Sequence, residues 1–182
     1  MADELIDILN EDGSCAGIQK MKSEAHEKGL WHASVQIWIY NSKNEILIQQ
    51  RAHNKDTYPN LWDISVAGHL SVGDSPITAS IREIKEEIGL GISAEALDFL
   101  KTVKKSKQPS PTIKDNEFNH LYLLHSDFII EELKLQTEEV AAVKLIPIKD
   151  FKQSIEQNSK EFVPHGKEYY HYIIKNIENK LG

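Results

Sequence analysis

Three glutamates lie within one turn of a predicted helix, and their crowding is the strongest chemical signal in the sequence. Glu83, Glu86 and Glu87 occupy positions i, i+3 and i+4, so their side chains share one helix face. Carboxylates this close repel one another, and the negative end of the helix dipole adds to the cost. A divalent cation with oxygen ligands would relieve the repulsion, and Mg²⁺ is the hard ion that such a site suits. The alternative is an ordinary solvated acidic face.

The helix that carries these glutamates has start and stop signals on both sides. Ser75 is a suitable N-cap, and Pro76 follows in the first turn, where its missing N–H is not needed. Gly89 can adopt the left-handed conformation that ends a helix. An apolar stripe recurs at helical spacing and consists of Ile77, Ile81, Ile84 and Ile88. We therefore expect an amphipathic helix that buries this stripe.

The spacing of the whole segment resembles the Nudix signature, G-x5-E-x7-R-E-U-x-E-E-x-G-U, in which U is aliphatic. The matching residues are Gly68, Arg82, Glu83, Ile84, Glu86, Glu87, Gly89 and Leu90. One position departs, because Asp74 stands where the family has glutamate. Asp74 could serve as an N-cap or act toward a metal. The resemblance extends over residues 31–157 and implies hydrolysis of a diphosphate that is linked to a further group.

The resemblance also implies roles for individual side chains. The metal ligands would be the carbonyl of Gly68 and the carboxylates of Glu83, Glu86 and Glu87, with Mg²⁺ or Mn²⁺ as cofactor. Arg82 would orient these carboxylates and contact substrate, although an ordinary surface ion pair is the alternative. Glu86 and Glu117 are the candidate catalytic residues. Glu117 is expected in a loop that feeds a strand, where catalytic residues are common.

A second resemblance, to type I isopentenyl-diphosphate isomerases of the same superfamily, surrounds the signature. It is carried by His32, the Arg51 and Lys55 pair, the strand with Trp62, Gly68-His69, and Asp115-Asn116-Glu117. It implies a candidate second metal site formed by His32, His69, Asp115 and Glu117, with His26 matching only across a one-residue gap. It also implies that Lys22, Arg51 and Lys55 hold the diphosphate.

Ala67 argues against isomerase activity. The isomerases place a catalytic cysteine at this position, and a methyl group cannot exchange protons with an allylic carbon. They have also lost most of the signature carboxylates, which this chain keeps. The sequence therefore favours a Mg²⁺-dependent diphosphohydrolase. An isomerase and a non-catalytic ligand-binding Nudix domain are the alternatives, and the sequence does not identify the substrate.

Composition sets limits on the partners of the protein. The chain has 182 residues, of which 40% are hydrophobic and 27% charged, and it carries a net charge of −7. This charge argues against binding to nucleic acid polymers or anionic membranes, so an anionic small-molecule substrate needs a local basic patch or a bridging metal. No apolar run approaches the roughly 18 residues of a membrane helix. The single Cys15 and the acidic first residues, which do not resemble a signal peptide, fit a cytoplasmic protein.

The order of elements predicts an α/β/α sandwich with a mixed central sheet. We expect an N-terminal hairpin and linker extension at 1–30, a Nudix domain at 31–157, and a C-terminal helix at 158–182 that packs on the same domain. The predicted strands are 33–40, 45–51, 61–67, 120–125 and 140–148, with a mobile loop at 104–115 and helices at 151–157 and from 167. The N-terminal hairpin could exchange with a second subunit, so a homodimer is an open expectation.

Overall fold

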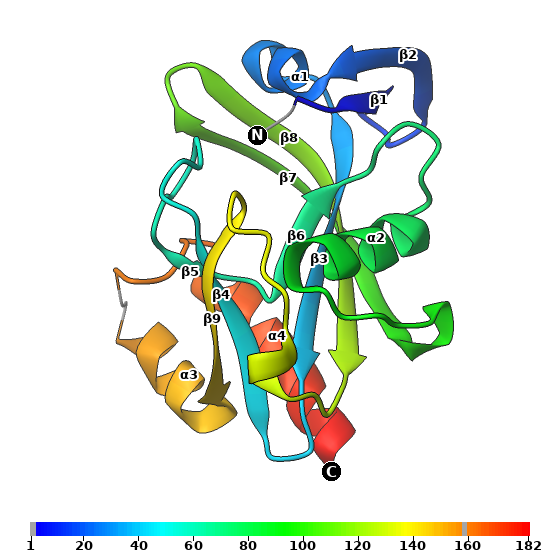
Figure 1. The fold of residues 1–182 in the computed structure, drawn as a ribbon. Coiled ribbons are helices and arrows are strands. Elements are labelled where there is room, and N and C mark those ends of the chain that lie inside the picture. Colours follow the sequence, from blue (N-terminus) through cyan, green and yellow to red (C-terminus); the bar gives the residue numbers. More distant parts are fainter. Residues whose placement is uncertain (1–2, 158–159) are drawn as a thin grey trace.

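The structure is a computed structural model that describes residues 3–157 and 160–182 (Figure 1). Its strands are β1 (Leu5–Leu9), β2 (Cys15–Met21), β3 (His32–Tyr40), β4 (Glu45–Arg51), β5 (Trp62–Asp63), β6 (Val66–His69), β7 (Leu97–Ser110), β8 (Ile113–His125) and β9 (Val140–Pro147). Its α-helices are α1 (Lys22–Lys28), α2 (Pro76–Ile88), α3 (Ile148–Glu156) and α4 (Lys167–Leu181). The first two residues of the predicted 1–30 extension and the predicted boundary at 158 lie outside the described residues.

A mixed seven-stranded sheet forms the centre of the molecule. The strand β3 pairs parallel with β8 and antiparallel with β4 and β6. On one side β8 continues antiparallel into β7, and on the other β4 pairs antiparallel with β5 and β9. Side chains of β3 alternate between the faces, so that Val35 and Ile37 enter one core and Trp38 enters the other.

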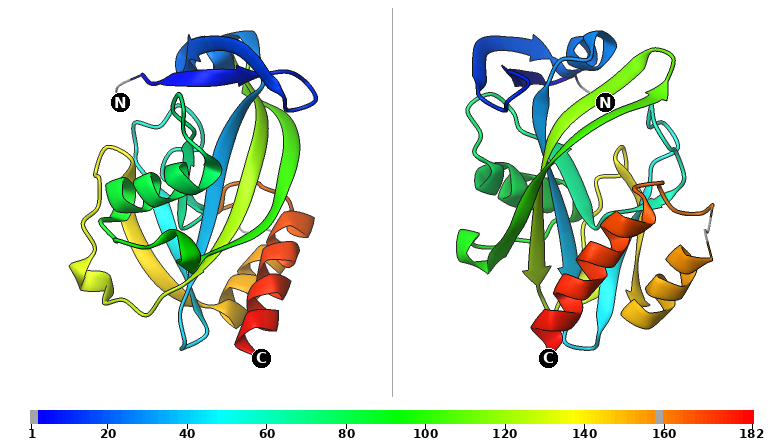
Figure 2. Two further views of the ribbon diagram at one scale, coloured as in Figure 1. Left: turned by 90° about the vertical axis from the view of Figure 1, so that its right-hand side faces the viewer. Right: turned by 180° about the vertical axis from the view of Figure 1, so that it is seen from behind.

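Helices cover both faces of this sheet, with α2 on one side and α4 on the other (Figure 2). Ile84 and Ile88 of α2 are fully buried in the core on the first face. Phe151 of α3 and Ile173 of α4 are fully buried in the core on the second face. The predicted α/β/α sandwich with a mixed sheet is confirmed.

The ends of α2 follow the predicted capping signals. Ser75 is the N-cap, and its Oγ accepts a hydrogen bond from the Thr78 N–H at 3.2 Å while the Thr78 hydroxyl accepts from the Ser75 N–H at 2.8 Å. Gly89 ends the helix with φ of 73°, a left-handed conformation that glycine adopts without steric cost. The helix is thereby fixed at both ends.

The prediction of a mobile loop at 104–115 is wrong. These residues belong to a long antiparallel hairpin in which β7 pairs with β8 from Leu97 to Ser110. The lysine, serine and proline content resembles a loop, but cross-strand hydrogen bonds decide the structure. Pro109 is tolerated because β7 is an edge strand and the register shifts between Lys107 and Ser110. Glu117 consequently lies inside β8 and not in a loop.

The single strand predicted at 61–67 is two strands, which pair with different neighbours. The strand β5 pairs with β4, and β6 pairs with β3. Between them, Ser65 Oγ donates to the carbonyl of Leu47 and accepts from the N–H of Ile39 at 2.8 Å. This buried serine links β3 and β4 at the point where the chain passes from β5 to β6, the strand that contains Gly68.

The predicted N-terminal hairpin is present as β1 and β2, and α1 follows it directly. Figures 1 and 2 show this unit at the end of the sheet where the β7–β8 hairpin projects. The Leu9 N–H donates to the Trp31 carbonyl, and the Asn116 side chain of β8 donates to the Gly29 carbonyl at 2.7 Å. These contacts hold the end of α1 beside the sheet. None of the helices in the described residues combines the length and apolar character needed to cross a membrane.

Candidate active site

A cavity of about 530 Å³ opens between α2, β6, the β7–β8 hairpin and the N-terminal unit. It is lined by nearly all of the predicted site residues, namely Lys22, His26, Arg51, Lys55, Gly68, His69, Arg82, Glu83, Glu86, Glu87, Asp115 and Glu117. His32 is fully buried and contacts the lining residues His26 and Glu117. The fold therefore brings together residues that are up to 95 positions apart, from Lys22 to Glu117.

Arg82 connects the carboxylates of α2 to the loop before the helix. Its Nη1 donates to Glu83 at 2.8 Å and to Glu86 at 3.2 Å. Its Nη2 donates to the His69 carbonyl at 2.9 Å and to Asp74 at 3.0 Å. The N-cap role considered for Asp74 belongs to Ser75, and Asp74 instead anchors Arg82. A guanidinium with this many acceptors orients the carboxylates that it contacts.

Gly68 provides the space that the Glu83 carboxyl group occupies. A β-carbon at Gly68 would lie 2.1 Å from Glu83 Cδ and 2.2 Å from Glu83 Oε1. Only glycine allows the backbone of β6 to approach the carboxyl group this closely. The carbonyl oxygen of Gly68 and the carboxylate oxygens of Glu83 consequently lie in one small region of the cavity wall.

Glu83 and Glu87 are buried carboxyl groups without full charge compensation. Burial raises the pKa of Glu83 to about 7, although Arg82 opposes the shift. Burial, together with the nearby Glu83, also raises the pKa of Glu87 well above its ordinary value. Gln49 donates to Glu87 at 3.2 Å, and in the described part of the chain its own Oε1 is a buried atom without a hydrogen-bond partner. Two buried carboxyl groups with raised pKa values, beside an amide oxygen without a partner in the described residues, are oxygen ligands that fit a hard divalent cation.

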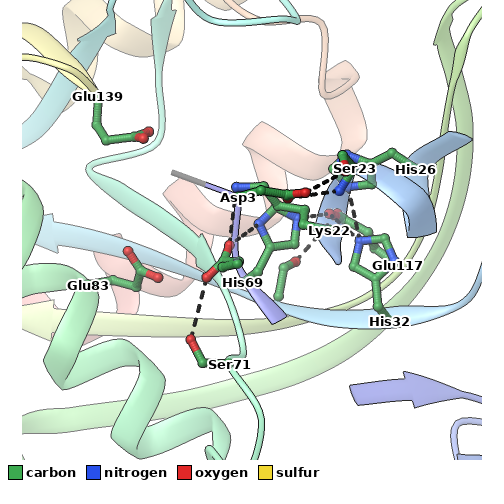
Figure 3. A network of polar contacts seen from close by, with 12 residues as sticks. Asp3, Lys22, Ser23, His26, His32, His69, Ser71, Glu83, Glu117 and Glu139 are labelled. Carbon is green, nitrogen blue, oxygen red and sulfur yellow. Dashed lines mark hydrogen bonds and ion pairs between the residues drawn. The ribbon is translucent and has the colours of Figure 1, made fainter. Parts of the chain in front are cut away.

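A separate cluster of three histidines and a glutamate lies above α2 (Figure 3). One ligand atom from each of His26, His32, His69 and Glu117 lies within 4.8 Å of the others. The Nε2 atoms of His26 and His32 are 3.2 Å apart, and His69 Nε2 lies 3.2 Å from Glu117 Oε1. Imidazole and carboxylate ligands in this arrangement fit a divalent transition metal.

The charges in this cluster are set by burial and by mutual contact. Burial opposes ionisation of Glu117, but hydrogen bonds with His32 and His69 outweigh it and hold the pKa of Glu117 well below its usual value. Burial and the two neighbouring rings lower the pKa of His26 to about 3. Asp115 lies 3.7 Å from His26, and burial with the Glu117 charge raises its pKa to about 6. Burial opposes protonation of His32, but its hydrogen bond with Glu117 outweighs burial and raises the pKa of His32, whereas burial lowers the pKa of His69. The cluster therefore combines an ionised carboxylate with a neutral His26 ring, the forms that bind metal.

The candidate substrate-binding cations outside α2 each pair with a carboxylate. These pairs are Lys22 with Glu4 at 3.2 Å, Arg51 with Asp63 at 3.1 Å, and Lys55 with Glu139. Glu139 precedes β9 and lines the cavity opposite Glu83 (Figure 3). Acidic residues outnumber lysines and arginines in the lining of the cavity, so an anionic substrate would also need a bridging cation.

Sequence reasoning missed a buried pair formed by Asp63 and His165. The two side chains meet at 2.6 Å, although the residues are 102 positions apart. Burial opposes ionisation of Asp63, but the charges of His165 and Arg51 outweigh it and lower the pKa of Asp63 to about 2. No local pattern in the sequence indicates this contact.

Sequence reasoning also missed Lys105 and Lys107, which line the cavity from β7. Burial and the neighbouring Lys107 lower the pKa of Lys105 to about 8. The two lysines alternate with the exposed Lys104 and Ser106. The alternation is one of exposure and not of residue type, so Lys104-Lys105-Ser106-Lys107 carries no sequence signal for their common face.

Comparisons with known proteins agree with the fold. A family model for the NUDIX domain matches residues 30–166 of the chain. Nudix hydrolase 3 of Arabidopsis thaliana is 34% identical over 170 residues, which cover 91% of this chain and 22% of that protein, so the chain spans a small part of this relative's length. An uncharacterized Nudix hydrolase of Clostridium acetobutylicum is 30% identical over 205 residues, which cover 97% of this chain and 98% of that protein.

An isopentenyl-diphosphate Δ-isomerase of Serratia proteamaculans is also similar, with 33% identity over 121 residues that cover 66% of this chain and 65% of that protein. Among solved structures, a protein of Deinococcus radiodurans superposes with a TM-score of 0.69 at 21% sequence identity. The superposition covers 93% of this chain and 98% of that one, and at this identity it shows the shared fold.

Proposed function

We propose that this chain, which belongs to the Nudix family, hydrolyses a diphosphate linkage in a small-molecule substrate with a divalent cation, Mg²⁺ or Mn²⁺, as cofactor. The observation that carries the proposal is the contact of Arg82 with both Glu83 and Glu86 on the cavity wall, where Gly68 leaves room for the Glu83 carboxyl group. The glutamates of an ordinary acidic helix face are solvated, whereas here Glu83 and Glu87 are both buried and Glu83 lies against Gly68.

Gly68, Glu83, Glu86 and Glu87 would hold the cation through oxygen atoms. When bound, it would neutralise charge on the diphosphate and increase the acidity of an attacking water. Arg82 keeps Glu83 and Glu86 in place through the hydrogen bonds described above. The chain's part in this chemistry is therefore to present fixed oxygen ligands at the edge of the cavity.

Arg51 and Lys55 would bind the diphosphate from the opposite side of the cavity, with Lys22 contributing from α1. Their present carboxylate partners keep the side chains directed into the cavity in the absence of substrate. A diphosphate would replace part of each contact with charge-assisted hydrogen bonds of its own.

Glu86 and Glu117 are the two candidates that could accept a proton from the attacking water. A carboxylate whose pKa lies well below its usual value is a weak base, so Glu117 suits metal ligation better than proton transfer. Glu86 is half exposed, with 50% of its side chain accessible, and it borders the cavity. We therefore assign the base to Glu86.

Isomerisation of an isoprenoid diphosphate is the second candidate function. The cluster of His26, His32, His69 and Glu117 and the similarity to an isopentenyl-diphosphate isomerase favour it. Ala67 opposes it, because the cavity wall beside Gly68 carries a methyl group where an acid would be needed.

A single experiment separates the two functions. The protein is incubated with isopentenyl diphosphate, nucleotide sugars and dinucleoside diphosphates, each with Mg²⁺ or Mn²⁺. Hydrolysis is measured as phosphate monoesters formed, or as inorganic phosphate released from isopentenyl diphosphate, and double-bond migration is measured in parallel. We expect hydrolysis of at least one compound in the panel and no migrated double bond. Migration without hydrolysis would establish the isomerase and reject the hydrolase.

A further inference from the structure

Lys105 and Lys107 form one wall of the cavity. They occupy alternate positions of β7, so their side chains point to the same face of the strand, and both are half-buried. Lys105 Nζ lies 3.4 Å from the carbonyl oxygen of His165, and Lys107 Nζ lies 3.4 Å from that of Pro164. These carbonyls hold the two ammonium groups at the edge of the cavity.

These two lysines differ from the other cations of the cavity in forming no salt bridge in the described part of the chain. Their cross-strand neighbours on β8 are Glu117, which contacts His32 and His69, and Asp115, which contacts His26. The partnered cations are Lys22, Arg51, Lys55 and Arg82, each of which forms an ion pair with a carboxylate. Within residues 3–157 and 160–182, neither Lys105 nor Lys107 forms such a pair. Because the two side chains also contact each other, two like charges lie together on a half-buried wall. An anion between them would remove this repulsion.

The remainder of this wall is polar as well. His165 and Asp63 form a buried pair beside the lysines, and both line the cavity. The aliphatic residues that line the cavity in the described part of the chain are Val35, Ile64, Ala67, Ile113 and Val163. An apolar tail placed here would remove water from two ammonium groups without providing a hydrogen-bond partner, which is costly.

We propose that Lys105 and Lys107 form a subsite for a second anionic group of the substrate, a carboxylate or a phosphate, beyond the diphosphate that is cleaved. This inference rests on the proposed hydrolase function, in which Arg51 and Lys55 hold the diphosphate. It defines the substrate class as a diphosphate whose further group is polar and negatively charged. An isoprenoid chain does not meet this description.

The test compares ligands that differ only in charge beyond the diphosphate. UDP-glucuronate is paired with UDP-glucose to test a carboxylate, and 2′-phospho-ADP-ribose is paired with ADP-ribose to test a phosphate. Dissociation constants are measured by calorimetry with Mg²⁺ present, on analogues of these ligands in which a methylene group replaces the bridging oxygen of the diphosphate, so that the cation is in place and turnover does not consume the ligand. The proteins are wild type, the double variant Lys105→Met/Lys107→Met, each single variant, and Lys104→Met. Lys104 is the matched control, because it is exposed on the opposite face of the same strand.

We expect wild type to bind the charged member of at least one pair about tenfold more tightly or better, which is the range of a hydrogen bond to a charged group. The double variant should lose this preference, each single variant should lose part of it, and Lys104→Met should keep it. The pair that shows the preference identifies the carboxylate or the phosphate. Equal affinities within both pairs in wild type, or a preference that survives in the double variant, would overturn the subsite.

Formation of phosphate monoesters with Mg²⁺ is measured separately on the unmodified ligands and on the substrate panel. A charge preference in binding without hydrolysis of any diphosphate would reject the hydrolase and retain the subsite. Hydrolysis of a diphosphate without a charge preference in binding would retain the hydrolase and reject the subsite.

Discussion

The Glu83 carboxyl group occupies the space where a side chain at position 68 would begin, because a β-carbon on Gly68 would lie 2.1 Å from Glu83 Cδ. This relationship links the loop and the helix of the signature segment. A glycine at one end of the segment is required by the position of a carboxylate fifteen residues later.

Gly68→Ala is therefore expected to displace the Glu83 carboxyl group and to lower kcat/KM about a hundredfold, since misplacement of about 1 Å has effects of that size. The fold should survive, because the displaced group borders an open cavity. Steady-state kinetics and thermal unfolding measure the two effects. Gly91→Ala is the matched control, as a β-carbon at Gly91 meets nothing within 4 Å. Wild-type kinetics in Gly68→Ala would show that the close contact has no functional role.

Asp74 and Arg82, which form an ion pair at 3.0 Å, should be coupled energetically. Asp74→Ala removes an acceptor from Arg82 Nη2 and frees the guanidinium to shift away from Glu83. In a double-mutant cycle of Asp74→Ala with Arg82→Gln, we expect a coupling energy of about 0.5–3 kcal/mol in the free energy of unfolding. Additive effects within error would mean that Asp74 does not hold Arg82.

The contribution of Asp63 to stability should depend on pH. Its pKa is lowered from 3.8 to about 2 in the folded protein, so its contribution is full above about pH 4 and is lost as the pH falls toward 2. Asp63→Asn should therefore cost roughly 2 kcal/mol of unfolding free energy at neutral pH. The difference from wild type should narrow below about pH 4. Urea unfolding at pH 7, 5, 4 and 3 measures it, and a constant difference across this range would contradict the assignment.

The histidine and glutamate cluster should bind a transition metal independently of turnover. After removal of metals with a chelator, titration with Co²⁺ is expected to produce visible absorption that reports imidazole ligation. His69→Ala should weaken this binding about tenfold or more, because removing a ligand costs at least as much as removing a residue that supports one. The exposed His53 offers the control His53→Ala. Identical titrations for wild type and His69→Ala would reject the cluster as a metal site.

The sequence allows α2 and its carboxylates to be predicted because the signals are local. Ser75 and Gly89 define the ends of the helix, and the spacing of Glu83, Glu86 and Glu87 places them on one face. The sandwich can be predicted as well, from the order of its strands and helices. The alternation at 33–40 predicts a half-buried strand, whereas β3 is buried along its whole length.

The parts that could not be predicted depend on contacts between distant residues. The strand around Lys105 is stabilised by pairing with β8, and its composition alone resembles a loop. The contact of His165 with Asp63 joins two segments that the sequence does not relate to each other. The charged wall formed by Lys105 and Lys107 could therefore be recognised only in the folded chain.

The most direct test of the central claim is the turnover of Glu86→Gln and Glu87→Gln with the best diphosphate substrate found in the screen, in the presence of Mg²⁺. Each change keeps the size of the side chain and removes its negative charge. If these carboxylates hold the cation and activate water, each variant should lose at least about a hundredfold in kcat while circular dichroism shows an intact fold. Rates equal to wild type in both variants would contradict the assignment of the signature glutamates as the hydrolytic site.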